Sequence, residues 1–126
     1  MATANKSAGE LDVVINEKPY LLRPSYAAVL DFEDRANTTV FEAMRAVGER
    51  QSASLKSVAT VFHACIKAGW TPRDGKTPTF DEIVAAVYKD GLSAHMQAYL
   101  TILSNMLTGE RAMGAAMKEV EQGKAE

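Results

Sequence analysis

Two histidines and one cysteine are the side chains of this chain best suited to chemistry. His63 and Cys65 stand two positions apart, and His95 lies much further along the chain. Neither histidine has a second histidine four residues away or a Glu-x-x-His partner, the spacings that build a metal site on a helix. Helix positions two apart point to different faces, so His63 and Cys65 do not form a nucleophile–base pair. We expect boundary or surface histidines and a buried thiol at Cys65.

Acidic residues gather at two places. Asp31 and Asp34 share one helix face, together with Glu33 nearby; a cation could bind there, but we favour a solvated helix face. Asp81 and Glu82 fit the first turn of a helix, where carboxylates favour the positive end of the dipole. Gly69, Gly75 and Gly91 are isolated and make no phosphate-binding loop. We therefore predict that the protein is not an enzyme and has no catalytic residue, metal site or cofactor.

Composition narrows the class further. The chain has 126 residues, of which 47% are hydrophobic and 24% charged, and its net charge is −2. This length favours one domain, and there is no basic stripe of the kind that nucleic-acid binding needs. The opening MATANKSAGE has no apolar segment of a signal peptide, and no stretch approaches the roughly 20 apolar residues of a membrane span. We expect a cytoplasmic protein that binds neither nucleic acid nor membrane.

The segment LDVVINEKPYLLR predicts a β-hairpin within residues 10–23. A two-residue turn at Asn16 and Glu17 would place five apolar side chains on one sheet face, namely Leu11, Val13, Ile15, Tyr20 and Leu22. Pro19 would then oppose Val14, with its missing N–H outside the ladder. Glu17 stands where such turns favour glycine, so a longer loop is an alternative.

Helical patterns fill residues 25–109. The expected N-caps are Ser25, Thr39, Ser54 and Thr79. Gly91 and Gly109 are expected to end their helices, Gly48 to end or fray its helix, and Gly69 to take the left-handed position just past its helix. The apolar positions expected to face the core are Tyr26, Val29, Leu30 and Phe32; Val40, Phe41, Met44 and Val47; Leu55, Val58, Val61, Phe62, Cys65 and Ile66; Phe80, Ile83, Val84, Val87 and Tyr88; and Leu92, Met96, Tyr99, Leu100, Leu103, Met106 and Leu107. The loop TPRDGKTPT separates the third and fourth helices. The predicted fold class is α+β, mostly α: an N-terminal two-stranded β-hairpin followed by a bundle of about five helices.

Domain organisation follows from these elements. We expect a flexible leader at residues 1–9, a single domain at 10–109 and a tail at 110–126 that is weakly helical or disordered without a partner. Because few large apolar residues occur in the tail, it has little to bury by itself.

Four residues are candidates for partner contact. In the tail, Met113, Met117 and Val120 form a thin apolar stripe, and methionine adapts well to varied partners. Trp70 follows the third helix, and an exposed tryptophan is an efficient anchor for a partner. The alternative, which we favour for Trp70, is that it folds back on the last helical turn near Cys65.

The stretch GELDVVINEKPYLLRPSYAAVLDFEDRANTTVFEAM, residues 9–44, resembles the opening of the gene-transfer-agent and siphophage tail assembly chaperone family. The likeness lies in the hairpin, in a Y-x-L-R-P-[ST] passage and in an acidic step near the end of the first helix, here Tyr20, Leu22, Arg23, Pro24, Ser25 and Phe32-Glu33. It extends over residues 9–109. Asn16-Glu17 replaces the Asp-Gly that the family often has, and the linker TPRDGKTPT is longer than expected.

The resemblance implies a non-enzymatic protein of the bacterial host cytoplasm. Its expected partner is the tape-measure protein, with the tail-tube protein as a second partner, and a homo-oligomer is expected. A hairpin edge offers a template for strand addition between copies.

Two other functions remain open. One is a structural role as a minor tail or head–tail connector protein of the virion or gene transfer agent, which high copy number in purified particles would indicate. The other is a small enzyme or a DNA-binding regulator. A helix-turn-helix in residues 54–90 would need a turn of about three or four residues, which TPRDGKTPT exceeds.

Overall fold

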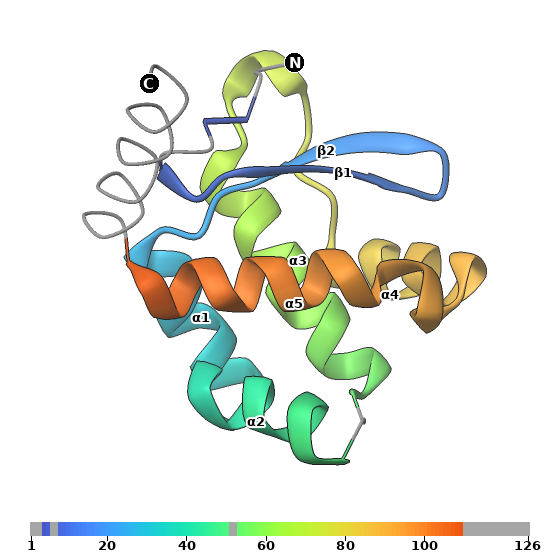
Figure 1. Ribbon diagram of the computed structural model, residues 1–126. Coiled ribbons are helices and arrows are strands. Elements are labelled where there is room, and N and C mark those ends of the chain that lie inside the picture. The colour runs from blue at the N-terminus through green and yellow to red at the C-terminus, as the bar shows by residue number, and fades with distance from the viewer. Residues whose placement is uncertain (1–3, 6–7, 51–52, 110–126) are drawn as a thin grey trace, which may run out of the picture.

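The computed structural model describes residues 4–5, 8–50 and 53–109 of the chain. Within them, an antiparallel hairpin precedes the helices (Figure 1). Its strands are β1 (Leu11–Ile15) and β2 (Lys18–Leu22). The helices are α1 (Tyr26–Ala36), α2 (Val40–Arg50), α3 (Leu55–Gly69), α4 (Phe80–Asp90) and α5 (Leu92–Thr108), with a 3-10 turn at Pro72–Asp74. The described residues confirm the predicted α+β, mostly α, class.

The hairpin has the predicted register. Val13 pairs with Tyr20, and Ile15 pairs with Lys18. The turn has two residues, because Asn16 and Glu17 both take positive φ angles of 51° and 67°, as type I′ turns require. The predicted inner face is buried at Val13, Ile15, Tyr20 and Leu22 and partly buried at Leu11. The longer loop does not form.

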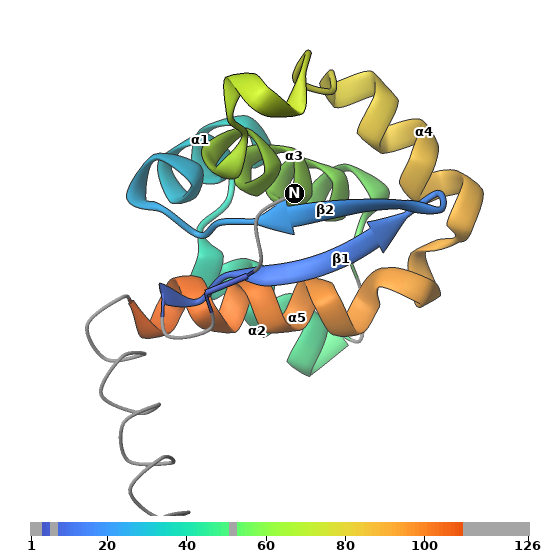
Figure 2. The same ribbon diagram turned by 90° about the horizontal axis from the view of Figure 1, so that it is seen from above.

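Helix α3 lies at the centre of the molecule. It contacts α1, α4, α5 and β2, and Figure 2 shows the hairpin between α3 and α5. Every residue from Val58 to Ile66 is buried, including Thr60 and His63. The predicted single apolar stripe was therefore too narrow, because neighbours cover this helix on all sides. The Thr60 hydroxyl donates to the Lys56 carbonyl within the helix, so its burial leaves no polar group unpaired.

The helix boundaries follow local capping. Hydroxyl oxygens of the four predicted N-caps accept backbone N–H bonds of 3.0–3.2 Å, and these residues are Ser25, Thr39, Ser54 and Thr79. Gly91 and Gly109 follow the ends of α4 and α5 with φ of 91° and 80°. These N-cap and C-terminal predictions are confirmed.

Two glycine predictions are wrong. Helix α2 continues through Gly48 to Arg50. Gly69 is the last residue of α3 rather than a left-handed residue beyond it. A Cβ at Gly69 would lie 3.3 Å from Cδ2 of Leu21, so this glycine permits β2 to pack closely on the end of α3.

Several apolar residues expected in the core are exposed. Tyr26 and Leu30 of α1 are 83% and 62% exposed, and Phe41 of α2 is 63% exposed. Tyr88 and Leu107 are likewise exposed. In α1 the reason is geometric: Ala28 and Phe32 are buried, and residues two positions away lie on the opposite helix face.

Part of the predicted leader makes hydrogen bonds. The Asn5 carbonyl accepts from the backbone N–H groups of Ala8 and Glu10, both at 3.0 Å. The Gly9 carbonyl accepts from Asn105 Nδ2 at 2.8 Å, which ties the chain start to α5. Among residues 4–5, 8–50 and 53–109, none of the helices has the length and apolar character that a membrane crossing needs.

Candidate functional site: a groove between α1 and the end of α5

A groove of about 790 Å³ lies where the start of α1 approaches the end of α5. We call it the α1–α5 groove. Its larger apolar side chains are Pro24, Tyr26, Val29, Leu30 and Met106, and its other lining residues are Asn5, Ala8, Glu10, Arg23, Ser25 and Gly109. The groove therefore has an apolar side and a polar rim, and the rim combines residues before β1 with residues between β2 and α1.

The rotation of α1 creates the apolar side of the groove. Phe32 is fully buried and fixes which face of α1 meets the core. Tyr26 and Leu30, one helical turn apart, then point away from that core. Val29 lies between the two faces and is partly buried. Two large apolar side chains thus remain uncovered side by side in the described part of the chain.

An ion pair forms the polar rim. Arg23 Nε lies 2.7 Å from Glu10 Oε2, and the Glu10 side chain is only 7% exposed. The second carboxylate oxygen of Glu10 accepts the Asn5 backbone N–H at 2.9 Å. The Arg23 backbone N–H donates to the Cys65 carbonyl at 3.0 Å. These bonds fix the connection between β2 and α1, and with it the position of the groove.

Both histidines lie elsewhere and are buried, at 7% exposure for His63 and 5% for His95. The prediction of boundary or surface histidines was wrong, because contacts from other elements enclose both rings. His63 packs edge-on against Phe80, and its Nε2–H donates to the Pro78 carbonyl at 3.0 Å. Burial lowers the pKa of His63, and Arg35 and Lys67 lower it further against the opposing hydrogen bond. The neutral ring leaves Nδ1 without a hydrogen-bond partner in the described chain.

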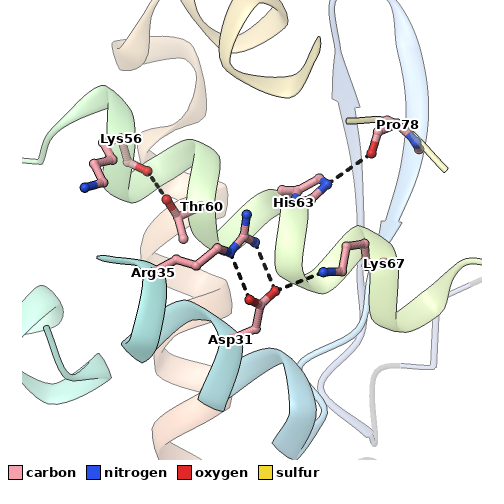
Figure 3. A network of polar contacts seen from close by, with 7 residues as sticks. All are labelled: Asp31, Arg35, Lys56, Thr60, His63, Lys67 and Pro78. Carbon is pink, nitrogen blue, oxygen red and sulfur yellow. Dashed lines mark hydrogen bonds and ion pairs between the residues drawn. The ribbon is translucent and has the colours of Figure 1, made fainter. Parts of the chain in front are cut away.

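An acidic residue near His63 joins α1 to α3 (Figure 3). Asp31 accepts from Arg35 at 2.9 and 3.0 Å and from Lys67 at 3.4 Å. Asp34 is exposed, as a solvated face predicts, whereas the Asp31 side chain is 26% exposed and is held by these ion pairs. Glu33 accepts the Val40 backbone N–H at 3.1 Å and so supports the start of α2. In the residues described, no three His, Cys, Asp or Glu side chains gather as metal ligands would.

His95 belongs to a hydrogen-bonded cluster with Asp90 and Asn16 at the tip of the hairpin. Asp90 Oδ2 accepts from the Asn16 backbone N–H and from His95 Nε2, each at 2.8 Å. The first of these bonds, with help from the second, lowers the pKa of Asp90. This cluster connects the β-turn to the α4–α5 junction, so the role of His95 is structural.

Cys65 is a fully buried thiol, as predicted. Burial raises its pKa well above the ordinary range. The thiolate form, which a nucleophile requires, is therefore suppressed.

Of the predicted partner-contact residues, Trp70 is described. It directly follows α3; its ring lies 6.4 Å from that of Tyr20, and its Nε1–H donates to the Gly75 carbonyl at 2.8 Å. A partner contact at Trp70 stays a prediction. Met113, Met117 and Val120 lie outside the described residues.

The groove itself escaped the sequence reasoning. Its signal was present in α1, where Tyr26/Leu30 and Ala28/Phe32 form two stripes offset by two positions. The two stripes lie on opposite faces of the helix, so only one of them can meet the core. Comparison of the chain with protein-family models, curated proteins and solved structures gives no significant match.

Proposed function

We propose that this protein is a non-enzymatic phage tail assembly chaperone that binds the tape-measure protein and assists tail-tube assembly. One observation carries the proposal: Tyr26 and Leu30 are 83% and 62% exposed beside an open groove. Large apolar residues grouped on a surface mark sites of interaction with other molecules. The resemblance of residues 9–44 to the tail assembly chaperone family supports the identity of the partner.

The groove suits a helical partner. An amphipathic helix binds a groove through apolar anchors spaced three or four residues apart. Tyr26 and Leu30 supply a ridge with that spacing, and Met106 supplies an adaptable side chain on the α5 side. The tape-measure protein, apolar and helical in the family that this chain resembles, has the required character.

The energetics favour many weak contacts over one strong contact. Fully burying two side chains such as Tyr26 and Leu30 gains about 3–6 kcal/mol, which association costs of at least about 4 kcal/mol largely offset. A single groove would then bind weakly. Several copies along one extended client would gain avidity, which supports a homo-oligomeric chaperone with the tail-tube protein as a further partner.

Co-expression with tape-measure fragments tests the proposal. We expect the wild-type chain to keep such a fragment soluble and to copurify with it. Leu30→Asp should reduce recovery of the fragment by at least about tenfold, because one lost anchor costs about 1.4 kcal/mol or more. Phe41→Asp is the matched control, since Phe41 is also a helical residue and is 63% exposed against 62% for Leu30. Equal recovery with both variants, or none with wild type, would reject the proposal.

A further inference from the structure

We propose that, when no client is bound, the α1–α5 groove is covered by the C-terminal segment of the same chain, residues 110–126. The segment would dock Met113 and Met117 against Tyr26, Val29 and Leu30. This inference goes beyond the proposed function, because it assigns the groove an occupant that belongs to the protein itself. Docking of the segment does not depend on the chaperone proposal. Competition between the segment and a client does depend on it.

The position where the described chain ends is the first argument. Gly109 lines the groove and ends α5 with φ of 80°. A glycine in this conformation redirects the chain instead of continuing the helix. Seventeen residues follow it. Four residues span at most about 14 Å, so the chain after Gly109 is long enough to bring Met113 to the groove.

The pattern of the segment is the second argument. Met113, Met117 and Val120 occur at i, i+4 and i+7, which places them on one face of a helix. Four residues of helix rise about 6 Å, so Met113 and Met117 have the same spacing as Tyr26 and Leu30. In such a helix Arg111 and Lys118 fall on the opposite, solvent-facing side.

The direct connection is the third argument. No linker separates α5 from the segment, because residue 110 follows Gly109 at the groove. Short tethers give effective concentrations in the millimolar range. A docking contact too weak to form between separate molecules would therefore still cover the groove in this chain. A client helix would have to displace the segment, so its apparent affinity would fall accordingly.

Disulfide trapping in the full chain tests the assignment. Leu30→Cys is combined with Met117→Cys, and the control combines Phe41→Cys with Met117→Cys. Bond formation needs Cα atoms within about 7 Å, and native Cys65 is fully buried and stays out of the reaction. We expect the first pair to form an intramolecular bond at least about tenfold faster than the control, as its higher effective concentration requires. Equal rates would overturn the proposal, and covalent dimers from the first pair would assign the groove to a second copy.

Trypsin cleavage after Arg111 and Lys118 tests docking without a covalent bond. Proteolysis tracks the population of the open form, so Leu30→Asp should be cut at least about fivefold faster than wild type. Phe41→Asp should match wild type, and circular dichroism verifies that both variants fold. Cleavage of all three chains at one rate would contradict docking. No client is present in either experiment, so a negative result here leaves client binding intact, and failed client binding leaves docking of the segment intact.

Discussion

At the scale of single residues, His63 shows how burial turns a reactive side chain into a structural one. Its Nε2–H is bonded to Pro78, and no acceptor in the described chain faces Nδ1. A second proton would add an unpaired N–H and a positive charge near Arg35 and Lys67. Asp31 offsets part of that charge, but the pKa of His63 is lowered all the same, chiefly by burial.

The stability of the fold should therefore fall in mild acid. The unfolded chain takes up a proton at His63 as the pH drops through about 6.5, the ordinary histidine pKa, while the folded chain resists until its own lower pKa. Between these two values the unfolded state binds more protons, so lower pH favours it, by at most about 1.4 kcal/mol per pH unit. His63→Gln keeps an N–H donor and should lose this component. Urea unfolding of both chains between about pH 5 and 7.5 measures it, and identical pH profiles would contradict the prediction.

Glu17 carries backbone strain that a glycine would relieve. Its φ of 67° lies in the left-handed region, which costs a residue with a Cβ about 1–2 kcal/mol. Glycine gives back part of this gain through its greater freedom in the unfolded chain. Glu17→Gly should thus raise the free energy of unfolding by about 0.5–1 kcal/mol. Glu17→Ala keeps the Cβ and is the control; a gain of the same size in alanine would rule out strain as the cause.

At the scale of elements, the sequence was enough to predict strand register and helix starts. It was not enough to predict which face of α1 packs against the core. The alternation from Leu11 to Leu22 set the hairpin register, and hydroxyl residues such as Ser25 and Thr79 marked helix starts, because these signals act between near neighbours in the chain. Which face of α1 turns inward depends on where Phe32 finds space against α3. That choice is made by packing between distant segments, and it created the groove that the sequence analysis missed.

Two helical glycines allow local helix propensity to be measured separately from packing between distant segments. Gly48 has open space where a Cβ would stand, whereas at Gly69 a Cβ would lie 3.3 Å from Leu21 and 3.5 Å from Arg23. Gly48→Ala should stabilise the protein by about 0.5–1 kcal/mol, the usual advantage of alanine within a helix. Gly69→Ala has the same local gain, but its Cβ requires the Leu21 side chain to shift by a few tenths of an ångström, so we expect a smaller gain or a net loss. Thermal unfolding of the two variants side by side checks this, and equal stabilisation would mean that the Leu21 side chain yields to the added Cβ without cost.

At the scale of the whole molecule, α3 connects the hairpin to the helices. Leu22 from β2, Phe62 from α3 and Ile102 from α5 belong to one buried cluster. The same enclosure explains the buried histidines and Thr60, whose surroundings come from segments far apart in sequence. A two-stranded hairpin is at best marginally stable alone, so β1 and β2 depend on this shared core.

The hairpin and the helices should consequently unfold together. Trp70 is the single tryptophan, and its ring lies 6.4 Å from that of Tyr20 in β2, so its fluorescence reports the contact between the hairpin and the end of α3. Far-UV circular dichroism reports the helices. For a cooperative domain the two urea transitions coincide. Leu22→Ala should shift both by the same amount, with a loss of about 2–5 kcal/mol for a fully buried leucine.

Val14→Ala is the matched control on the opposite face of the hairpin, where Val14 is 62% exposed. Exposed substitutions usually change stability by no more than about 0.5 kcal/mol, and both probes should again agree. An early fluorescence transition in Leu22→Ala, with the helical signal unmoved, would show that the hairpin detaches from a stable helical bundle. Arg23, which follows β2, would then no longer be held in place at the polar rim of the groove, although α1 and α5 would stay folded. Coincident transitions mean instead that the groove persists as long as the domain is folded.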